Sequence, residues 1–404
     1  MTRAMTWLEP LRSSVSEIND TAWSDLRRLG AAIDELCAGA PESADVAARS
    51  RWLVQLRREL AAGRLSAPSG REGLVWQSLA QFSAGFHDLD LRDATGPGHG
   101  AMVLEDGTPT AHSRWAGRLA AGQLIGIAAT ERHGGTRIQE ITTRAVTCRD
   151  GTWRISGEKC WVSRLIESAG FVVFFRDPDG RISSAIIDAD SPQLAREVIE
   201  PSGLGGWSWG VLRLHDLPVD PTVDLIGRPG DGLGVFRRHF SRFRPVVAAT
   251  ALGTAAGVHT LVTEALAAKT RVGMLPRVRD NALVALGRTH AEITAATLAA
   301  VAVARLAAEA HPQADFAARV GKAACVDTAV RAVADLAPLI GAAGFARAHP
   351  LAKARADLTG LLYADGIHDS LYRSGGLSLL AESIALTTPV RPRAVASHHY
   401  GTAA

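Results

Sequence analysis

The sequence predicts an α+β chain of several domains: an N-terminal α-helical domain, a central small antiparallel β-barrel or sandwich, and a C-terminal domain like a four-helix bundle. Apolar residues recur at three- and four-residue spacing in the first and last parts of the chain, which is typical of helices. Between them, short β-prone runs alternate around turn residues. We expect domains at 1–122, 123–235 and 236–392, followed by a tail at 393–404.

The helical parts differ in how apolar they are. Near the N-terminus, amphipathic segments such as "SRWLVQLRRELAAG" and "GLVWQSLAQFSAGF" are separated by Gly- and Pro-rich breaks. After residue 236 the helices are longer and rich in Ala, Leu and Val, as in "NALVALGRTHAEITAATLAAVAVARLAAEA". Helices with so much apolar surface suit a bundle that is covered on several sides, and we expect a homodimer or homotetramer to supply part of the cover.

The central part contains two hairpin signals. One lies around Asp150-Gly151 and the other around "DPDG" at 177–180, each flanked by β-prone residues. The run "VLRLHDLPV" at 211–219 extends the same sheet.

Composition excludes several classes of protein. The formal net charge is +3 over 404 residues, and no Lys/Arg run is interleaved with aromatics, so we expect no nucleic-acid partner. Thr, Gly and His interrupt the apolar stretch 245–263, which favours a buried helix over a membrane span. The start "MTRAMTWLEP" has no apolar signal region, and we expect a cytoplasmic protein. The four cysteines and the pair in "SHHYG" lack metal-site spacing, so no metal is predicted.

Four stretches together resemble the acyl-CoA dehydrogenase superfamily. They are "IAATERHGGT" (127–136), "ISGEKCWVS" (155–163), "FSRFRPVVAATALGTAAG" (240–257) and "LIGAAGFARAHPLAKARAD" (339–357). Their order and spacing match the family across most of the chain, which is far more specific than any one motif. The resemblance implies an FAD held between the β domain and the C-terminal bundle.

The resemblance also assigns residues to the flavin. It places the Thr130 hydroxyl near the pyrimidine edge, the Trp161 indole against the isoalloxazine, the Ser163 hydroxyl beside N5, and Thr136 where the family has a Ser. A hydroxyl can donate to and accept from a ring edge with carbonyl and imide groups, and a broad indole excludes water from a flat ring. The alternatives are a core aromatic for Trp161 and a strand-edge hydroxyl for Ser163.

Other cofactor contacts are implied at the far end of the bundle. Lys269 and Arg271 match the region where the family has an Arg near the pyrophosphate of a neighbouring subunit's FAD. Gly341 and Gly344 belong to the family's glycine-rich turn, which lets the backbone approach a phosphate closely. Two departures are Pro338 for the usual Gln and Ala342 for the second glycine.

The stretch "LLYADGIHD" (361–369) contains the candidate base. An Asp before a Gly is common in turns and helix caps. The resemblance, however, puts Asp365 where much of the family has its catalytic Glu, with Gly366 following as in the family. A carboxylate there removes the α proton of a thioester while a hydride passes from the β carbon to flavin N5. His368 and Arg244 are candidates for substrate binding; the alternatives are a polar helix start and a packing role.

These observations predict an FAD-dependent α,β-dehydrogenation of an acyl thioester, on CoA or on an acyl-carrier protein. The electron acceptor is an electron-transfer flavoprotein or oxygen. The use of Asp in place of Glu favours a specialised biosynthetic pathway such as polyketide assembly. Two alternatives remain on the same fold: a flavin-dependent oxidase or monooxygenase, and a non-catalytic relative.

Overall fold

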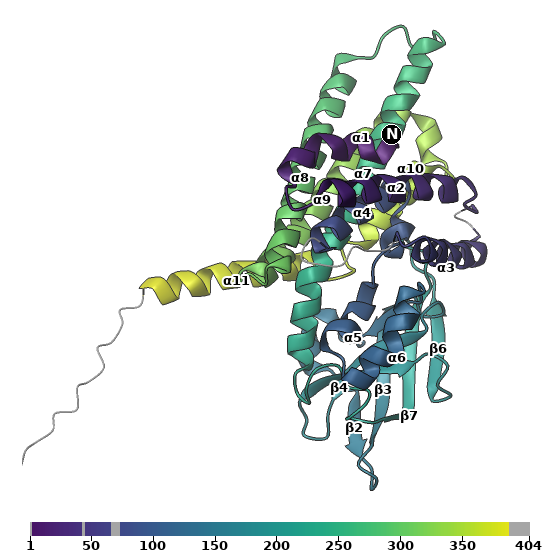
Figure 1. Cartoon of the computed structure of the whole chain (residues 1–404). Helices are drawn as coiled ribbons and strands as arrows, with labels where there is room; N and C mark the ends of the chain where they lie inside the picture. The colour runs from purple at the N-terminus through teal and green to yellow at the C-terminus, as the bar shows by residue number, and fades with distance from the viewer. Residues whose placement is uncertain (1, 43–44, 66–72, 388–404) are drawn as a thin grey trace, which may run out of the picture.

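The computed structural model describes residues 2–42, 45–65 and 73–387. It contains a helical N-terminal region, a curled sheet and a helical C-terminal region, in the order that the sequence predicts (Figure 1). The predicted tail at 393–404, which includes "SHHYG", lies outside the described residues.

The N-terminal region is built from short and medium helices, with η marking a 3₁₀ helix. They are α1 (Arg3–Leu8), η1 (Glu9–Ser14), α2 (Asp20–Ala38), α3 (Val46–Ala62), α4 (Gly73–His87), η2 (Leu89–Asp93), η3 (Gly98–Gly100), α5 (Ala101–Asp106) and α6 (Pro109–Ala120). Side-chain N-caps fix several of the starts, because a polar oxygen accepts from an amide that the helix leaves unpaired. These caps are Thr2, Asn19, Asp45 and Thr108.

The sheet has seven strands. They are β1 (Ile125–Ala128), β2 (Arg144–Thr147), β3 (Trp153–Ser163), β4 (Gly170–Arg176), β5 (Ile182–Asp188), β6 (Leu194–Ile199) and β7 (Trp209–Val219), with η4 (Gly135–Glu140) between β1 and β2. The order is β1-β4-β2-β3-β7-β6, and β5 pairs with β4. Both predicted hairpins are present, as β2–β3 and β4–β5.

Two features of the sheet differ from the prediction. β1 pairs with β4 in parallel, so the sheet is not wholly antiparallel. β6 was not predicted, because this edge strand has no buried residue and no alternation of buried and exposed residues.

The C-terminal region consists of α7 (Gly232–Arg271), α8 (Asp280–Ala308), α9 (Ala314–Ile340), η5 (Ala342–Phe345), α10 (Pro350–Gly360) and α11 (His368–Thr387). α7 begins before the boundary expected at 235/236. Its first turns pack on the sheet through Val235 and Phe236, so the helix continues from the sheet region into the bundle without a break.

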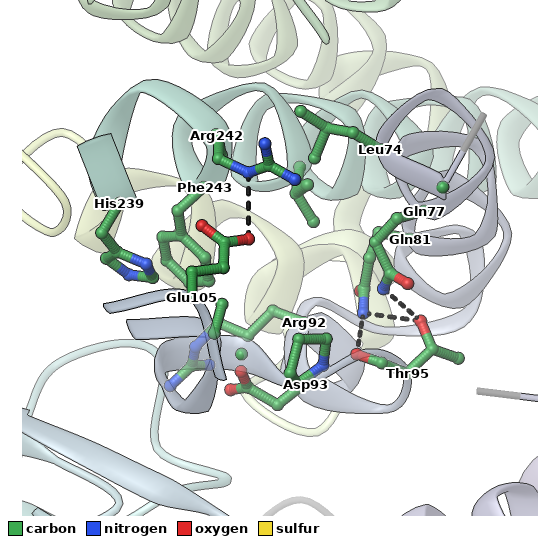
Figure 2. A pocket seen from close by; sticks show the side chains of 15 residues that line it. Leu74, Gln77, Gln81, Arg92, Asp93, Thr95, Glu105, His239, Arg242 and Phe243 are labelled. Atoms are coloured by element: carbon green, nitrogen blue, oxygen red, sulfur yellow. Dashed lines mark hydrogen bonds and ion pairs between the residues drawn. The ribbon is translucent and has the colours of Figure 1, made fainter. Parts of the chain in front are cut away.

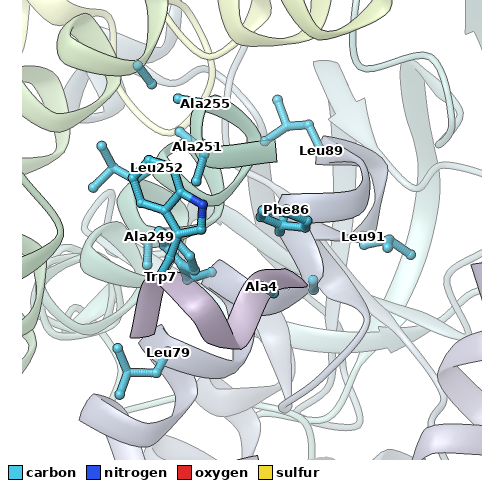
Figure 3. Packing of buried hydrophobic residues seen from close by; sticks show 14 of the residues in the cluster. Ala4, Trp7, Leu79, Phe86, Leu89, Leu91, Ala249, Ala251, Leu252 and Ala255 are labelled. Carbon is cyan, nitrogen blue, oxygen red and sulfur yellow. The ribbon is translucent and has the colours of Figure 1, made fainter. Parts of the chain in front are cut away.

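α4 and α7 cross at backbone contact. A Cβ on Gly85 would lie 2.1 Å from the Thr250 carbonyl oxygen, and one on Gly253 would lie 2.1 Å from that of Phe82. Only glycine fits at such a crossing. Trp7, Phe86 and Leu252 pack around it, so that α1, α4 and α7 share one apolar core (Figure 3).

The last helix carries exposed apolar residues. α11 extends away from the body of the molecule (Figure 1), and Leu377, Leu379 and Leu380 on it are more than half exposed.

Within the described residues, α7 and α8 are long and apolar enough to cross a membrane by length and composition alone. Buried core helices pass the same test, and 72% of the apolar window of α7 is buried here, against 33% for α8.

Candidate active site

A cavity of about 250 Å³ lies between the N-terminal helices and the first half of α7. Its lining comes from α4, η2, η3, α5 and α7 (Figure 2). Several lining groups are polar. Gln77 Nε2 and Gln81 Nε2 donate to Thr95 Oγ1 over 2.8 and 3.0 Å, and Glu105 lies 3.2 Å from Arg242. A cavity for hydrocarbon alone would not need the buried glutamines, since buried polar atoms are costly.

Two buried histidines meet at the cavity wall. His99 Nδ1 lies 2.9 Å from Nε2 of His239, and His239 lines the cavity. Burial lowers the pKa of His99 well below its ordinary value, and burial followed by the charge of Arg244 lowers the pKa of His239 to about 3. Both rings are therefore neutral at pH 7, and one donates to the other.

A buried ion pair connects the cavity to β3. Asp93 lines the cavity and accepts from Arg164 Nε over 2.5 Å, while Arg164 Nη1 donates to Ser163 Oγ over 2.5 Å. Arg164 thus connects Ser163, which is predicted beside the flavin, to Asp93 in the cavity lining.

Thr130 follows β1, and Trp161 and Ser163 end β3; we call these three residues the flavin wall, after the role that the sequence predicts for them. The register of β3 against β7 shifts between Lys159 and Val162, and Trp161 has φ +57° there. Such a bulge re-aims a side chain. The indole is 57% exposed, although its strand neighbour Val162 is buried. The Thr130 carbonyl accepts from Cys160 N over 2.8 Å, which brings the two segments together.

A buried ion pair joins the two segments that carry the flavin wall. Lys159 Nζ lies 2.9 Å from Glu131 Oε1, and the carboxylate also accepts from the amides of Thr142 and Thr143. Burial raises the pKa of Glu131, but the bonds from Thr143 and Lys159 outweigh it and bring that pKa to about 2. Of the predicted site residues, Thr136 lies in η4, where the structure gives its backbone position only.

Asp365 lies in the turn between α10 and α11. It has φ +57°, and Gly366 has φ +115°. Arg244 Nε donates to the Asp365 carbonyl over 3.1 Å. Arg244 directly follows Phe243, which lines the cavity, so α7 carries both a cavity residue and the residue that holds this turn.

Lys322 of α9 organises this turn. Its ammonium donates to the carbonyls of Leu361, Ala364 and Gly366 over 2.6, 2.7 and 3.0 Å. Burial lowers the pKa of Lys322 to about 7, against the opposing charge of Asp365. The ammonium thus closes the turn that carries the candidate base.

His368 lies behind the turn. Its Nε2 is 3.1 Å from Lys322 Nζ, and its Nδ1 is 2.7 Å from Asp327 Oδ1, which Tyr372 also contacts through the second oxygen. Burial, and then the charge of Lys322, lower the pKa of His368. Both ring nitrogens therefore have partners within the protein, and the predicted contact of His368 with substrate stays a prediction.

The predicted phosphate residues gather at the other end of α7. Lys269 Nζ donates to the Ile340 carbonyl over 3.2 Å, directly before Gly341, which has φ +81° and ends α9. Gly344 is buried in η5, and Arg271 is exposed in the last turn of α7. From Arg244, which contacts the Asp365 turn, to Lys269 the helix rises about 37 Å at about 1.5 Å per residue, so Lys269 lies far from the Asp365 turn of its own chain.

Among the charged residues described here that the sequence did not predict are Arg92, Asp93, Arg164 and Lys322. A lone lysine within the apolar helix segment "RVGKAACVD" was a usable signal, because a buried lysine needs partners. The other three are charged residues in ordinary turn and strand-end positions, where exposure is the normal expectation.

Two family models match the chain. Residues 126–217 match "Acyl-CoA dehydrogenase, middle domain", and residues 230–372 match "Acyl-CoA dehydrogenase, C-terminal domain". Together they span more than half of the chain. The chain belongs to the acyl-CoA dehydrogenase family. Membership makes FAD the cofactor and places the chain among oxidoreductases, as the sequence predicted.

Curated acyl-CoA dehydrogenases match over part of their length. "Probable acyl-CoA dehydrogenase FadE10" of Mycobacterium bovis is 33% identical over 156 residues, which is 37% of this chain and 24% of that protein. "Probable acyl-CoA dehydrogenase fadE25" of Mycobacterium leprae is 25% identical over 237 residues, or 57% of this chain and 60% of that protein. The matched stretch thus spans about a quarter of the first relative and 60% of the second.

Solved structures share the fold over nearly their whole length. Butyryl-CoA dehydrogenase from Megasphaera elsdenii has a TM-score of 0.75 at 19% identity, covering 90% of this chain and 98% of that one. A glutaryl-CoA dehydrogenase from Mycobacterium smegmatis in complex with FADH2 has 0.74 at 17%, covering 91% and 96%. The prolyl acyl carrier protein oxidase AnaB has 0.72 at 16%, covering 89% and 99%.

The flavin wall fits the cofactor of this family. It offers the open face of an indole, a buried hydroxyl at Ser163 and a second hydroxyl at Thr130. Gly134 beside it has φ +103°, a conformation that favours glycine, and no atom lies within 4 Å of where its Cβ would be. A flat aromatic face with hydroxyls and accessible backbone beside it suits a planar ring with a polar edge.

Proposed function

We propose that the chain catalyses the α,β-dehydrogenation of an acyl thioester, with Asp365 as the base that removes the α proton. The observation that carries this proposal is the state of the Asp365 carboxylate. It is half-buried, and it makes no hydrogen bond or ion pair to any residue in 2–42, 45–65 or 73–387. Its backbone, in contrast, is fixed by Lys322 and Arg244. An unpaired carboxylate on a fixed backbone meets the requirement for a base that acts on a carbon acid.

The turn accounts for the use of Asp in place of Glu. With φ +57°, residue 365 has a left-handed conformation that Asp tolerates better than most residues. Its oxygens lie about 1 Å closer to the backbone than those of Glu would. The α carbon of the substrate must therefore lie correspondingly closer to the turn.

The flavin wall supports the cofactor assignments. FAD, when bound, accepts the hydride from the β carbon. We assign Trp161 to covering the ring, Thr130 and Ser163 to its polar edge and N5 side, and Thr136 to the adjoining η4. Arg164 holds the Ser163 hydroxyl by donating to its oxygen, so the Ser163 hydrogen remains free to be donated.

We assign Lys269, Arg271, Gly341 and Gly344 to the FAD of a neighbouring copy in a homo-oligomer. The distance along α7 supports this, because Lys269 and the glycine turn that it contacts lie far from the Asp365 turn of their own chain. The exposed leucines of α11 and the partly exposed α8 provide apolar surface for such contacts. Arg244 holds the turn and His368 supports Lys322.

The carrier and the pathway are finer proposals. An acyl-carrier protein or CoA can present the thioester; AnaB, with the same fold, is named as an oxidase of a prolyl acyl carrier protein. The polar cavity, unlike one for hydrocarbon, favours a specialised biosynthetic reaction such as polyketide assembly. The electron acceptor is an electron-transfer flavoprotein, or oxygen if the enzyme is an oxidase, and the reaction belongs in the cytoplasm.

Anaerobic titration tests the proposal. Purified protein is mixed with CoA and phosphopantetheine thioesters, and the loss of flavin absorbance is followed. At least one thioester is expected to bleach the flavin. A protein that retains FAD, is reduced by dithionite and yet is bleached by no thioester would contradict the proposal. Admitting air afterwards separates the alternatives, since reoxidation within seconds indicates an oxidase and slow reoxidation indicates a dehydrogenase.

A further inference from the structure

Arg92 of η2 is a buried cation without a partner. Its residue is only 7% exposed, and it lines the cavity. Its Nη1 and Nη2 atoms are buried, and neither has a hydrogen-bond partner. Among the described residues, it is the one arginine or lysine with buried terminal nitrogens in this state.

The carboxylates near Arg92 are already committed to other cations. Asp93 pairs with Arg164. Asp90 pairs with Arg49 and Lys353, over 3.2 and 2.8 Å. Lys353 also holds Asp88 and Asp357. The ammonium of Lys353 is thus shared by three acids whose oxygens come within 4.8 Å of one another. At the rim of the cavity, Glu105 pairs with Arg242 (Figure 2).

An aromatic ring also lies near Arg92. The Arg92 guanidinium carbon lies 5.8 Å from the centre of the Trp209 ring, near the limit of a cation–π contact. Burying an unpaired charge is costly, and a cation–π contact at this distance offsets only a small part of that cost. A buried guanidinium without hydrogen-bond acceptors in the protein is expected to find them in a bound ligand.

Acceptor atoms line the same cavity. Gln77 and Gln81 both direct their amide nitrogens to Thr95, which leaves Oε1 of each buried and without a partner. The cavity therefore presents two guanidinium donors with a full positive charge, and two amide oxygens that accept. At about 250 Å³ it is smaller than most ligand pockets, which restricts it to a short chain.

We propose that Arg92 determines substrate specificity by binding a carboxylate on the acyl chain. The substrate class is a short acyl thioester with a free carboxylate and, beside it, a hydroxyl or amino group that donates to Gln77 and Gln81. This inference rests on the proposed function, since it names the substrate of that site. A carboxylate can accept hydrogen bonds from both terminal guanidinium nitrogens side by side. Such a pair orients the acyl chain in addition to pairing the two charges.

The test compares matched thioesters. Succinyl-CoA and its half-amide, succinamoyl-CoA, differ only in the charge of the terminal group. The affinity of the FAD-loaded protein for each is measured by calorimetry, and the rate of flavin bleaching is measured separately. The wild type is expected to bind the carboxylate at least about thirtyfold more tightly. The variant R92Q is expected to lose that preference, whereas R92K keeps part of it. Equal binding of both thioesters by the wild type would overturn the inference.

A matched control uses the second arginine of the cavity. Arg242 is already paired with Glu105, so R242Q is expected to keep a preference of at least about tenfold for the carboxylate. FAD content is determined for every variant, and loss of FAD from R92Q alone would show that Arg92 binds the cofactor, which also overturns the inference. The two proposals fail differently. Bleaching by thioesters without any charge preference refutes only the role of Arg92, whereas tight binding of succinyl-CoA without bleaching by any thioester refutes the dehydrogenation.

Discussion

Two buried cations differ in their hydrogen-bond partners: Lys322, at the Asp365 turn, and Arg92, in the cavity. Lys322 has three carbonyl partners, and the turn closes around it. Arg92 has a comparable burial and no partner for its terminal nitrogens. A satisfied buried charge fixes structure, whereas an unsatisfied one costs stability and is retained for a ligand. The difference separates residues that support the site from residues that meet the substrate.

Removing the satisfied cation is expected to have the largest effect. K322M leaves three carbonyls of the turn without their donor, and we expect the free energy of unfolding to fall by about 3 kcal/mol. Bleaching by all thioesters should slow together, whatever their charge. Urea denaturation at pH 7 and anaerobic bleaching measure the two effects. An unchanged unfolding midpoint would show that the ammonium does not hold the turn.

A second satisfied pair predicts a response to acid. The Glu131 pKa of about 2 lies below its ordinary 4.5, so its contribution is present above pH 4.5 and is lost as the pH falls toward 2. The unfolding free energy of the wild type should drop by roughly 2 kcal/mol over that range in excess of any drop in E131Q. Parallel stability curves for the two proteins would refute the pair's contribution.

The flavin wall predicts a smaller effect. W161A removes the exposed indole, and FAD should bind about tenfold more weakly, which corresponds to about 1.4 kcal/mol. Fluorescence titration of the apoprotein with FAD measures this affinity. The control is W153F, because Trp153 begins the same strand and packs against Phe175 instead of the wall. Equal loss of affinity in both variants would indicate a general effect on the sheet.

The smallest effect should have the opposite sign. R92M replaces an unpaired buried charge with an apolar chain of similar length, and the unfolding free energy is expected to rise by about 1 kcal/mol. Urea denaturation under the conditions used for K322M gives a direct comparison. A destabilisation as large as that of K322M would mean that Arg92 supports the fold, and the distinction between the two cations would disappear.

Local patterns predicted much of the fold. The two hairpins follow from turn residues between β-prone runs, and the long helices follow from their apolar periods. The parallel pairing of β1 with β4 depends on segments some forty residues apart, and β6 has no periodic signal. Neither feature could therefore be predicted from local sequence patterns.

The site was predicted less evenly, and for a physical reason. Motifs singled out Asp365, Trp161 and Ser163 as candidates, because their sequence context is distinctive. The importance of Lys322 and Arg92 depends on whether a partner lies within hydrogen-bonding distance, which is a property of the packed chain. His368 shows the same limit: its sequence suggests a polar helix start, whereas packing joins it to Lys322 and Asp327.

The central claim is that the Asp365 carboxylate removes the α proton. Single-turnover bleaching of D365N by the best thioester tests it most directly, with FAD content and thioester affinity measured on the same preparation. The account predicts bleaching slowed at least about a thousandfold with FAD retained, since a positioned base contributes about 10²–10⁴ in rate. Bleaching of D365N at the rate of the wild type would contradict it.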